Sequence, residues 1–173
     1  MKLRHLFFAY SGVFVMMFSL LLLVVIVFSD EEDGGSDGNL IYGGVSVSQE
    51  VLAHKPMLEK YAREYGIEEY LNVLLAIIQV ESGGTLEDVM QSSESLGLPP
   101  NSLSTEESIK QGCKYFSELL VAAETKGCDL NSVIQSYNYG GGFLDYVAGR
   151  GKKYTFELAE SFARDKSGGK KVT

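Results

Sequence analysis

Hydrophobic and polar residues follow three different patterns along this chain. Residues 6–29 are apolar or small and carry no charge, residues 30–47 are rich in glycine and acidic residues, and residues 48–166 mix apolar and polar positions. In the third region the apolar residues recur every three or four positions, which predicts amphipathic helices, whereas strict alternation is scarce. The pattern therefore predicts a mainly α-helical domain with few or no strands over residues 48–166.

The most apolar stretch of that domain is residues 74–80, which is followed by Glu81 and then by a glycine-rich break. At helical spacing, Leu74, Ile78 and Glu81 share one face, so the carboxylate continues an apolar stripe. An isolated carboxylate in apolar surroundings is costly to ionise and tends to keep its proton. A protonated Glu where a helix opens into a loop is suited to general acid catalysis near neutral pH. The alternative is a Glu at a helix end that simply reaches water.

Capping residues and glycines set the other predicted elements. Ser48 caps a short helix, Ser104 opens a long one through a capping box with Glu107, and Gly66 and Gly127 each end a helix. Between the third and fourth helices, the loop from residue 85 to residue 104 is either functional or a solvated connector. The predicted helices are residues 48–54, 56–65, 68–82, 105–126, 129–137, 143–148 and 154–164.

The N-terminal apolar run is long enough to cross a hydrocarbon core of roughly 30 Å as a helix. Lys2 and Arg4 precede it, and four acidic residues follow it at positions 30–33. This charge asymmetry predicts an anchor with its N-terminus in the cytoplasm and the domain outside the cell. A cleaved signal peptide is the alternative, but its apolar core is usually about 7–15 residues, followed by a small-residue cleavage site that is missing here. The predicted divisions are a cytoplasmic N-terminus and transmembrane anchor (1–29), a flexible acidic Gly-rich linker (30–47), the folded domain (48–166) and a polar tail (167–173).

Composition and charge narrow the functional classes. The formal net charge is −8 at pH 7, and the basic pairs are too small to form a phosphate-binding patch, so nucleic acid is not expected as a partner. The helix predicted between Cys113 and Cys128 would hold them about 20 Å apart, whereas a disulfide needs Cα atoms within about 7 Å. Both are therefore predicted to be free thiols, Cys113 in the core and Cys128 in a loop. Neither has a nearby histidine, since His5 precedes the membrane run and His54 stands alone, so no metal or other cofactor is expected.

Three motifs then occur in the order that is seen in a known family. Residues 79–84, Gln-Val-Glu-Ser-Gly-Gly, resemble the Glu-Ser motif of goose-type lysozymes and soluble lytic transglycosylases. Residues 88–95 resemble the Met-Gln loop that follows it, and residues 136–142, Ser-Tyr-Asn-Tyr-Gly-Gly-Gly, resemble the later Tyr-Asn-x-Gly motif. The chain most resembles the bacteriophage-lysozyme-like domain of membrane-anchored cell-wall hydrolases from Gram-positive bacteria and their conjugative elements.

This resemblance implies a mostly helical lysozyme-like fold with a cleft for a glycan strand, and it implies Glu81 as the catalytic acid. Asp88 is the best-placed second catalytic carboxylate, with Glu87 and Glu94 as alternatives. The residues that the resemblance assigns to substrate binding are Gln91, Ser92, Tyr137 and Asn138.

The implied activity is that of a muramidase, a glycoside hydrolase that cleaves the β-1,4 bond between N-acetylmuramic acid and N-acetylglucosamine at the outer face of the membrane. One alternative is a lytic transglycosylase, in which Glu81 serves first as acid and then as base. Another is a catalytically silent module that binds the wall or serves as a conjugation scaffold. Peptidoglycan is the expected partner, and conjugation machinery or a separate cell-wall peptidase are further candidates, because many relatives continue into a cysteine-peptidase domain.

Overall fold

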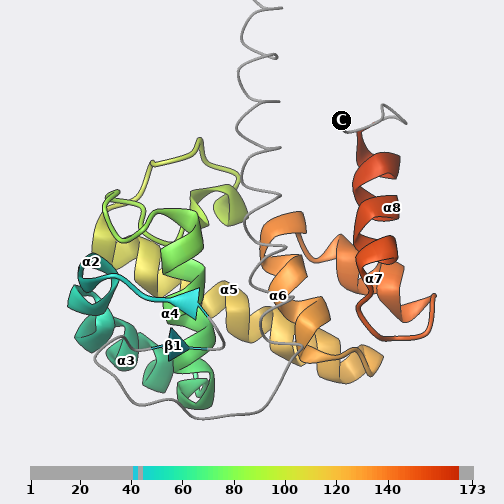
Figure 1. Ribbon diagram of the computed structural model, residues 1–173, viewed down its shortest axis with the longest axis horizontal. Helices are drawn as coiled ribbons and strands as arrows, with labels where there is room; N and C mark the ends of the chain where they lie inside the picture. The colour runs from blue at the N-terminus through green and yellow to red at the C-terminus, as the bar shows by residue number, and fades with distance from the viewer. Residues whose placement is uncertain (1–40, 43–44, 168–173) are drawn as a thin grey trace, which may run out of the picture.

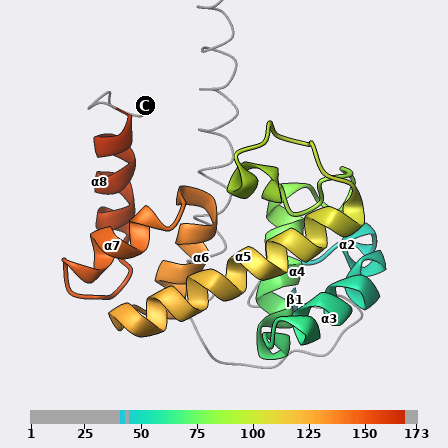
Figure 2. The ribbon, with the colours of Figure 1, turned by 180° about the vertical axis from the view of Figure 1, so that it is seen from behind.

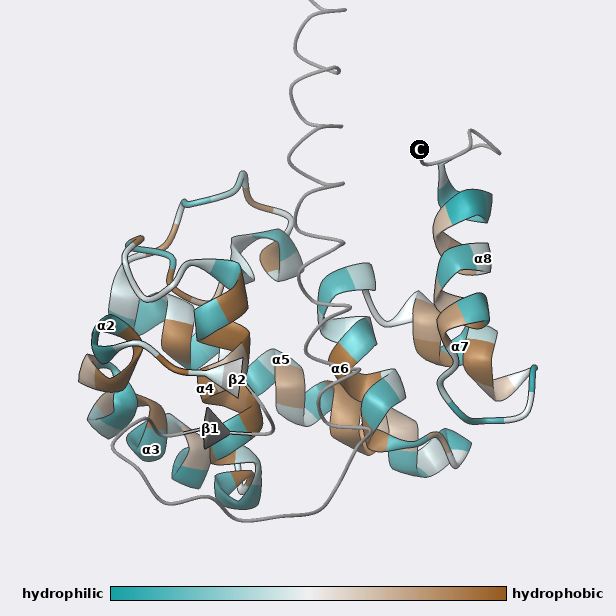
Figure 3. Cartoon of the chain, in the orientation of Figure 1, coloured by the Kyte–Doolittle hydropathy of each residue, from teal (hydrophilic) through white to brown (hydrophobic). Residues whose placement is uncertain are grey.

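Helix α4 (Leu71–Glu81) lies at the centre of the fold because its sequence is apolar on every side. All six residues from Val73 to Ile78 are at most 5% exposed. The computed structural model describes residues 41–42 and 45–167, and within them helices α2 (Gln49–Ala53) and α3 (Lys55–Glu64) pack beside α4 (Figure 1). Figure 3 shows the hydrophobic colour concentrated along α4. The buried central helix that the apolar run predicts is therefore present.

Helix α5 (Thr105–Lys126) runs across the whole domain and joins its two ends (Figure 2). Its capping box of Ser104 and Glu107 and its end at Gly127, which has φ of 70°, are as predicted. One face is fully buried against α3 at one end and α6 (Leu130–Tyr139) at the other. At Gly112 a Cβ would lie 2.5 Å from the Met90 sulfur, so a larger residue here would displace the Met90 side chain.

The C-terminal part of the domain consists of α6, α7 (Gly142–Ala148) and α8 (Phe156–Lys166). Helix α8 packs on α7 through a separate small core of Phe143, Val147, Ala159 and Phe162. Helix α6 continues two residues beyond the predicted end, through Asn138 and Tyr139, and stops at Gly140. Gly140 has φ of 82°, a left-handed value that glycine adopts at low cost.

Local hydrogen bonds move three other predicted boundaries. The 3-10 helix η1 (Glu68–Tyr70) precedes α4, so the acidic pair lies outside the α-helix proper. Helix α8 starts two residues late because the backbone N–H of Tyr154 donates to the carboxylate of Asp129, and Thr155 serves as the N-cap. The predicted irregular loop contains a short 3-10 helix, η2 (Ser92–Leu96).

Two short strands lie within the C-terminal part of the predicted linker. Strand β1 (Ile41–Tyr42) pairs antiparallel with β2 (Val45–Ser46) and packs beside α4, and Val47 is 3% exposed. The described structure therefore includes residues that precede the predicted start of the folded domain at residue 48. The predicted anchor, the first part of the linker and most of the polar tail lie outside the described residues. Among the residues that the structure describes, no helix is long and hydrophobic enough to cross a bilayer.

Both cysteines are free thiols, as predicted. Cys113 is fully buried, and burial raises the pKa of its thiol to about 12, whereas Cys128 is only partly buried. Because thiolates are the reactive species, we expect iodoacetamide to label Cys128 in the native protein well before Cys113. Both should be labelled after denaturation without reductant. Mass spectrometry of the labelled peptides measures this, and protection of both thiols in the denatured chain would contradict it.

Candidate active site

Glu81 is the last residue of the buried helix α4. The side chain is partly buried, and its Oε2 atom is enclosed with no hydrogen-bond partner among the described residues. Burial, followed by the negative charges of Glu94 and Asp88, raises the pKa of Glu81 from 4.5 to about 8. The carboxyl group therefore holds a proton at neutral pH, as the apolar stripe predicts.

The loop after Glu81 is fixed by short hydrogen bonds. The Ser82 hydroxyl donates to the Val89 carbonyl over 2.7 Å, and it accepts the Gly84 N–H over 3.0 Å. His54 Nε2 lies 2.9 Å from the Gly84 carbonyl. A Cβ at Gly84 would lie 2.7 Å from the backbone nitrogen of Val51, so this glycine lets the loop pack on α2. These contacts hold the end of α4, and hence Glu81, in one position.

Asp88 is completely buried, and its carboxylate organises the loop around it. The Oδ1 atom accepts the Ser92 N–H over 3.0 Å and the Ser108 hydroxyl over 2.6 Å. The Oδ2 atom accepts both the N–H and the hydroxyl of Ser93. With both oxygens occupied and no exposed surface, this geometry gives Asp88 a structural role and argues against water activation by its carboxylate.

The same network includes the predicted substrate residues of this loop. Ser92 is 2% exposed, and its hydroxyl donates to the Ser108 carbonyl over 2.9 Å, so the structure offers it no open group for a sugar. Gln91 has φ of 47°, and its Nε2 donates to the Asp88 carbonyl and to Asn101 Oδ1, each over 2.8 Å. Gln91 is partly exposed and keeps its carbonyl Oε1 for a ligand.

The motif on α6 reaches the same region from the other side. Tyr137 is 8% exposed, and its hydroxyl donates to the Met90 carbonyl over 3.1 Å, which joins α6 to the Asp88 loop. Burial, followed by the nearby charge of Glu81, raises the pKa of Tyr137 well above 10. Asn138 follows, and its Nδ2 is buried without a partner among the described residues, so that a donor is available beside Tyr137. The structure thus brings Glu81, Tyr137 and the Asp88 loop together.

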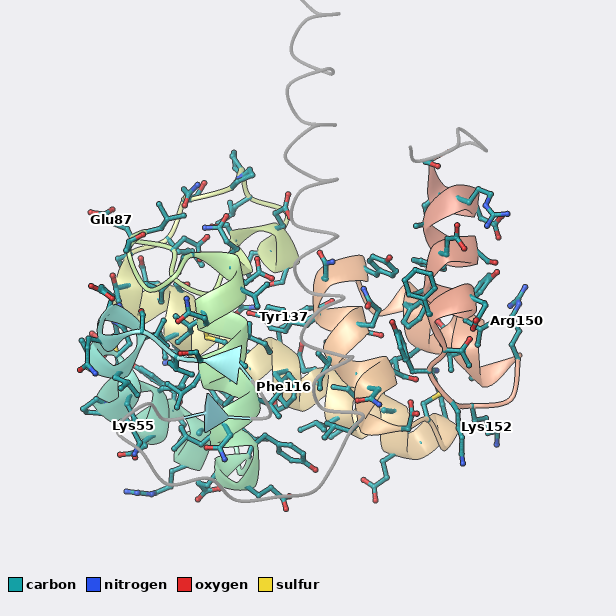
Figure 4. All side chains as sticks on the ribbon, viewed as in Figure 1. Lys55, Glu87, Phe116, Tyr137, Arg150 and Lys152 are labelled. Atoms are coloured by element: carbon teal, nitrogen blue, oxygen red, sulfur yellow. The ribbon has the colours of Figure 1, made fainter. Side chains whose placement is uncertain are left out.

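The two alternative carboxylates differ in position. Glu87 is exposed and lies at the outer edge of the domain, well separated from Tyr137 (Figure 4). Glu94 is exposed on η2, and its charge affects Glu81 more than the charge of Asp88 does. Glu94 is therefore the better placed of the two to act near the acid.

Two hydrogen-bonded serines of this region, Ser93 and Ser108, were not given a role by the sequence analysis. Ser108 lies one turn into α5, donates to Asp88 and accepts the Met90 N–H over 3.0 Å. Ser93 also accepts the Ser102 N–H over 3.0 Å and so closes the loop. The sequence signal that could have identified Ser108 was its position on the apolar face of α5, one residue before the buried Ile109.

The raised pKa of Glu81 predicts a pH-dependent stability. Between about 4.5 and about 8, the folded protein holds a proton that the unfolded chain has lost, so the free energy of unfolding should fall as pH rises through this window. Glu81→Gln removes this titration. Thermal unfolding from pH 5 to pH 8.5 should therefore show a steeper decline in Tm for the parent than for the variant. Parallel curves would contradict the assigned protonation state.

Other kinds of centre are not built here. Within residues 41–42 and 45–167, no three His, Cys, Asp or Glu side chains are grouped as metal ligands would be. A cavity of about 550 Å³ lies beside η1, α5 and α6, at the opposite end of α4 from Glu81. Glu81 is thus a candidate active-site residue because of its raised pKa, and it does not line this cavity.

These features define a class of protein: a mainly helical domain in which a buried central helix ends in a protonated carboxyl group beside a Tyr-Asn pair. Residues 48–172 match the model of the lysozyme-like family, and the chain belongs to that family.

Individual relatives agree with this assignment. The chain is 44% identical over 131 residues to the bifunctional muramidase/DL-endopeptidase CwlT of Bacillus subtilis. The matched region covers 75% of this chain and 38% of that protein. It is 33% identical to pneumococcal vaccine antigen A of Streptococcus pneumoniae serotype 4, over 68% of this chain and 58% of that protein. A crystal structure from Staphylococcus aureus Mu50, described as similar to a lipoprotein of the NLP/P60 family, has 75% sequence identity and a TM-score of 0.72, over 73% of this chain and 43% of that one. The chain thus spans between 38% and 59% of the curated relatives it matches.

Proposed function

We propose that this protein cleaves the glycan strands of peptidoglycan at the β-1,4 bond between N-acetylmuramic acid and N-acetylglucosamine. The observation that carries the proposal is the protonated Glu81 at the end of α4, adjacent to Tyr137 and the Asp88 loop. The 44% identity to a protein described as a muramidase supports the same bond.

In the proposed mechanism, Glu81 donates its proton to the glycosidic oxygen as the bond breaks. A carboxyl group with a pKa of about 8 is in its acid form at neutral pH, as this step needs. The unpaired Nδ2 of Asn138 and the free Oε1 of Gln91 would hold acetamido or hydroxyl groups of the sugars. Water then completes hydrolysis, and glycosidases commonly orient it with a second carboxylate.

The identity of that second carboxylate separates two reactions. If hydrolysis uses a second carboxylate, Glu94 is the candidate, because its carboxylate is exposed and lies near Glu81. The buried and fully hydrogen-bonded Asp88 favours a second candidate function, lytic transglycosylation, in which Glu81 acts as acid and then as base and the sugar's own hydroxyl replaces water.

Digestion of purified peptidoglycan by the full chain, with product identification by mass spectrometry, tests the proposal. Reducing muramic acid ends would identify a muramidase, and anhydro-muramyl ends would identify a transglycosylase. The absence of both products, with folded protein, would overturn the proposed cleavage and favour a wall-binding or conjugation-scaffold module.

The proposed location is the outer face of the cell membrane, with residues 6–29 as a single-pass anchor and a cytoplasmic N-terminus. Protease added to intact protoplasts should therefore digest the domain, as followed with an antibody against residues 48–166. Digestion that occurs only after lysis would contradict this orientation. Association with conjugation machinery or with a separate cell-wall peptidase stays a prediction.

A further inference from the structure

A second surface feature lies away from the acid. The cavity of about 550 Å³ is an open groove between the segment from Tyr65 to Tyr70, the outer face of α5 and the start of α6; we call it the α5 groove. It borders the N-terminal end of α4, and the length of that helix places it about 16 Å from Glu81. Its volume is within the usual range for ligand sites, and glycan cleavage as proposed above makes no use of it.

Part of the groove lining is apolar and open to solvent. Val121 is 64% exposed and Leu130 is 36% exposed, although both are large hydrophobic residues that line it. Two tyrosines, Tyr65 and Tyr70, also line it and are only partly buried. Adjacent exposed apolar side chains of this kind are typical of a surface that a partner covers.

The charged side chains that line the groove are both acidic, while Lys126 and Lys152 act on Cys128 at one end and Lys110 acts on Tyr65 at another. Glu69 and Glu124 both line it, both are exposed, and neither forms an ion pair among the described residues. The Tyr70 hydroxyl is hydrogen-bonded to Glu69, and the charges of Glu69 and Glu124 both act on this hydroxyl. No lysine or arginine lines the groove. Two carboxylates beside an aromatic ring favour a cation, through charge attraction and contact with the ring face.

We propose that the α5 groove binds an extended polypeptide segment in which apolar side chains are flanked by lysine or arginine. The apolar side chains cover Val121 and Leu130, and the cation lies between Glu69 and Glu124 over Tyr70. This division into an apolar centre and a charged rim is the usual anatomy of a protein–protein interface. The carboxylates repel phosphate groups, so the occupant is a peptide and not a nucleic acid or teichoic-type polyanion.

Cys128 provides an internal probe, because it lines the groove and is one of only two cysteines in the chain. Cys113 is buried and serves as the unreactive reference. The full chain, held in mild detergent, is treated with iodoacetamide in the presence of the synthetic peptide acetyl-Leu-Lys-Leu-Lys-Leu-amide. The matched peptide carries glutamate in place of both lysines. We expect the lysine peptide to slow alkylation of Cys128 in a saturable manner and the glutamate peptide to have no effect.

The double substitution Glu69→Gln and Glu124→Gln should weaken the lysine peptide roughly fivefold, since each exposed charge pair contributes modestly. Both positions are exposed, so the fold should survive, as circular dichroism can check. The matched control is Glu118→Gln, which removes the same charge from an exposed position of α5 outside the groove and should leave peptide binding unchanged. Peptidoglycan cleavage should be unaffected by the double substitution, and Glu81→Gln should not alter peptide binding.

Several results would overturn the proposal. These are equal protection of Cys128 by both peptides, no protection by either, or protection that the double substitution does not weaken. Protection by N-acetylglucosamine oligomers without protection by the lysine peptide would instead make the groove a sugar site. Dimerisation that the double substitution abolishes, without peptide binding, would make it a contact between two copies.

Discussion

Replacing Glu81 by Gln is expected to lower peptidoglycan cleavage by at least about 10²–10⁴-fold, the usual contribution of general acid–base catalysis. The amide keeps the size and hydrogen-bonding capacity of the side chain but has no proton to transfer. The fold should survive and gain stability at alkaline pH, because the change removes a carboxylate whose ionisation burial opposes. Turbidity clearing of purified cell walls, with thermal unfolding measured on the same preparation, provides both values.

Glu94→Gln is a suitable companion, since it makes the same chemical change at an exposed position whose charge acts on Glu81. If Glu94 orients water, activity falls without any change in Tm. If the reaction is a transglycosylation, Glu94→Gln retains most of the activity while Glu81→Gln does not. Folded Glu81→Gln protein that digests walls at the parent rate would remove Glu81 from the mechanism.

Asp88→Asn is expected to destabilise the protein by about 2–4 kcal/mol. Asparagine offers one oxygen where the aspartate accepts four donors with two, so at least one of the Ser92, Ser93 and Ser108 donors loses its partner in a fully buried site. For a domain of this size the expected fall in Tm is roughly 10 °C. Differential scanning calorimetry measures it directly.

Activity separates the two roles considered for Asp88. If the carboxylate holds the loop, the variant should lose activity in step with loss of the folded state, and it should regain activity at lower temperature. Glu87→Gln, on the same loop but exposed, should change stability by less than about 0.5 kcal/mol. An Asp88→Asn protein with the parent Tm and no activity would instead support direct activation of water by Asp88.

Local pattern alone determined much of this protein. The long apolar run predicts a buried helix because no face of it can be solvated, and Glu81 at its end must then share that burial. Capping residues such as Ser104 and Gly127 predict helix ends because they satisfy or terminate backbone hydrogen bonds within a few residues. Free thiols at Cys113 and Cys128 follow from the length of one helix. Each of these properties depends on contacts that are close in sequence.

Only the tertiary structure decided the roles of the loop residues. Asp88 looks like a catalytic carboxylate by its spacing from Glu81, yet its burial depends on Ser108, twenty residues away on α5. Ser92 is likewise buried through its hydrogen bond to Ser108. The hydrogen bond from Tyr137 to Met90 joins residues that are 47 positions apart. A carboxylate activates water only if the fold leaves it open, and burial is set by which helices meet around it. The sequence therefore determined where the protonated carboxyl group of Glu81 lies, whereas the packing of α4, α5 and α6 decided which neighbouring side chains are open beside it.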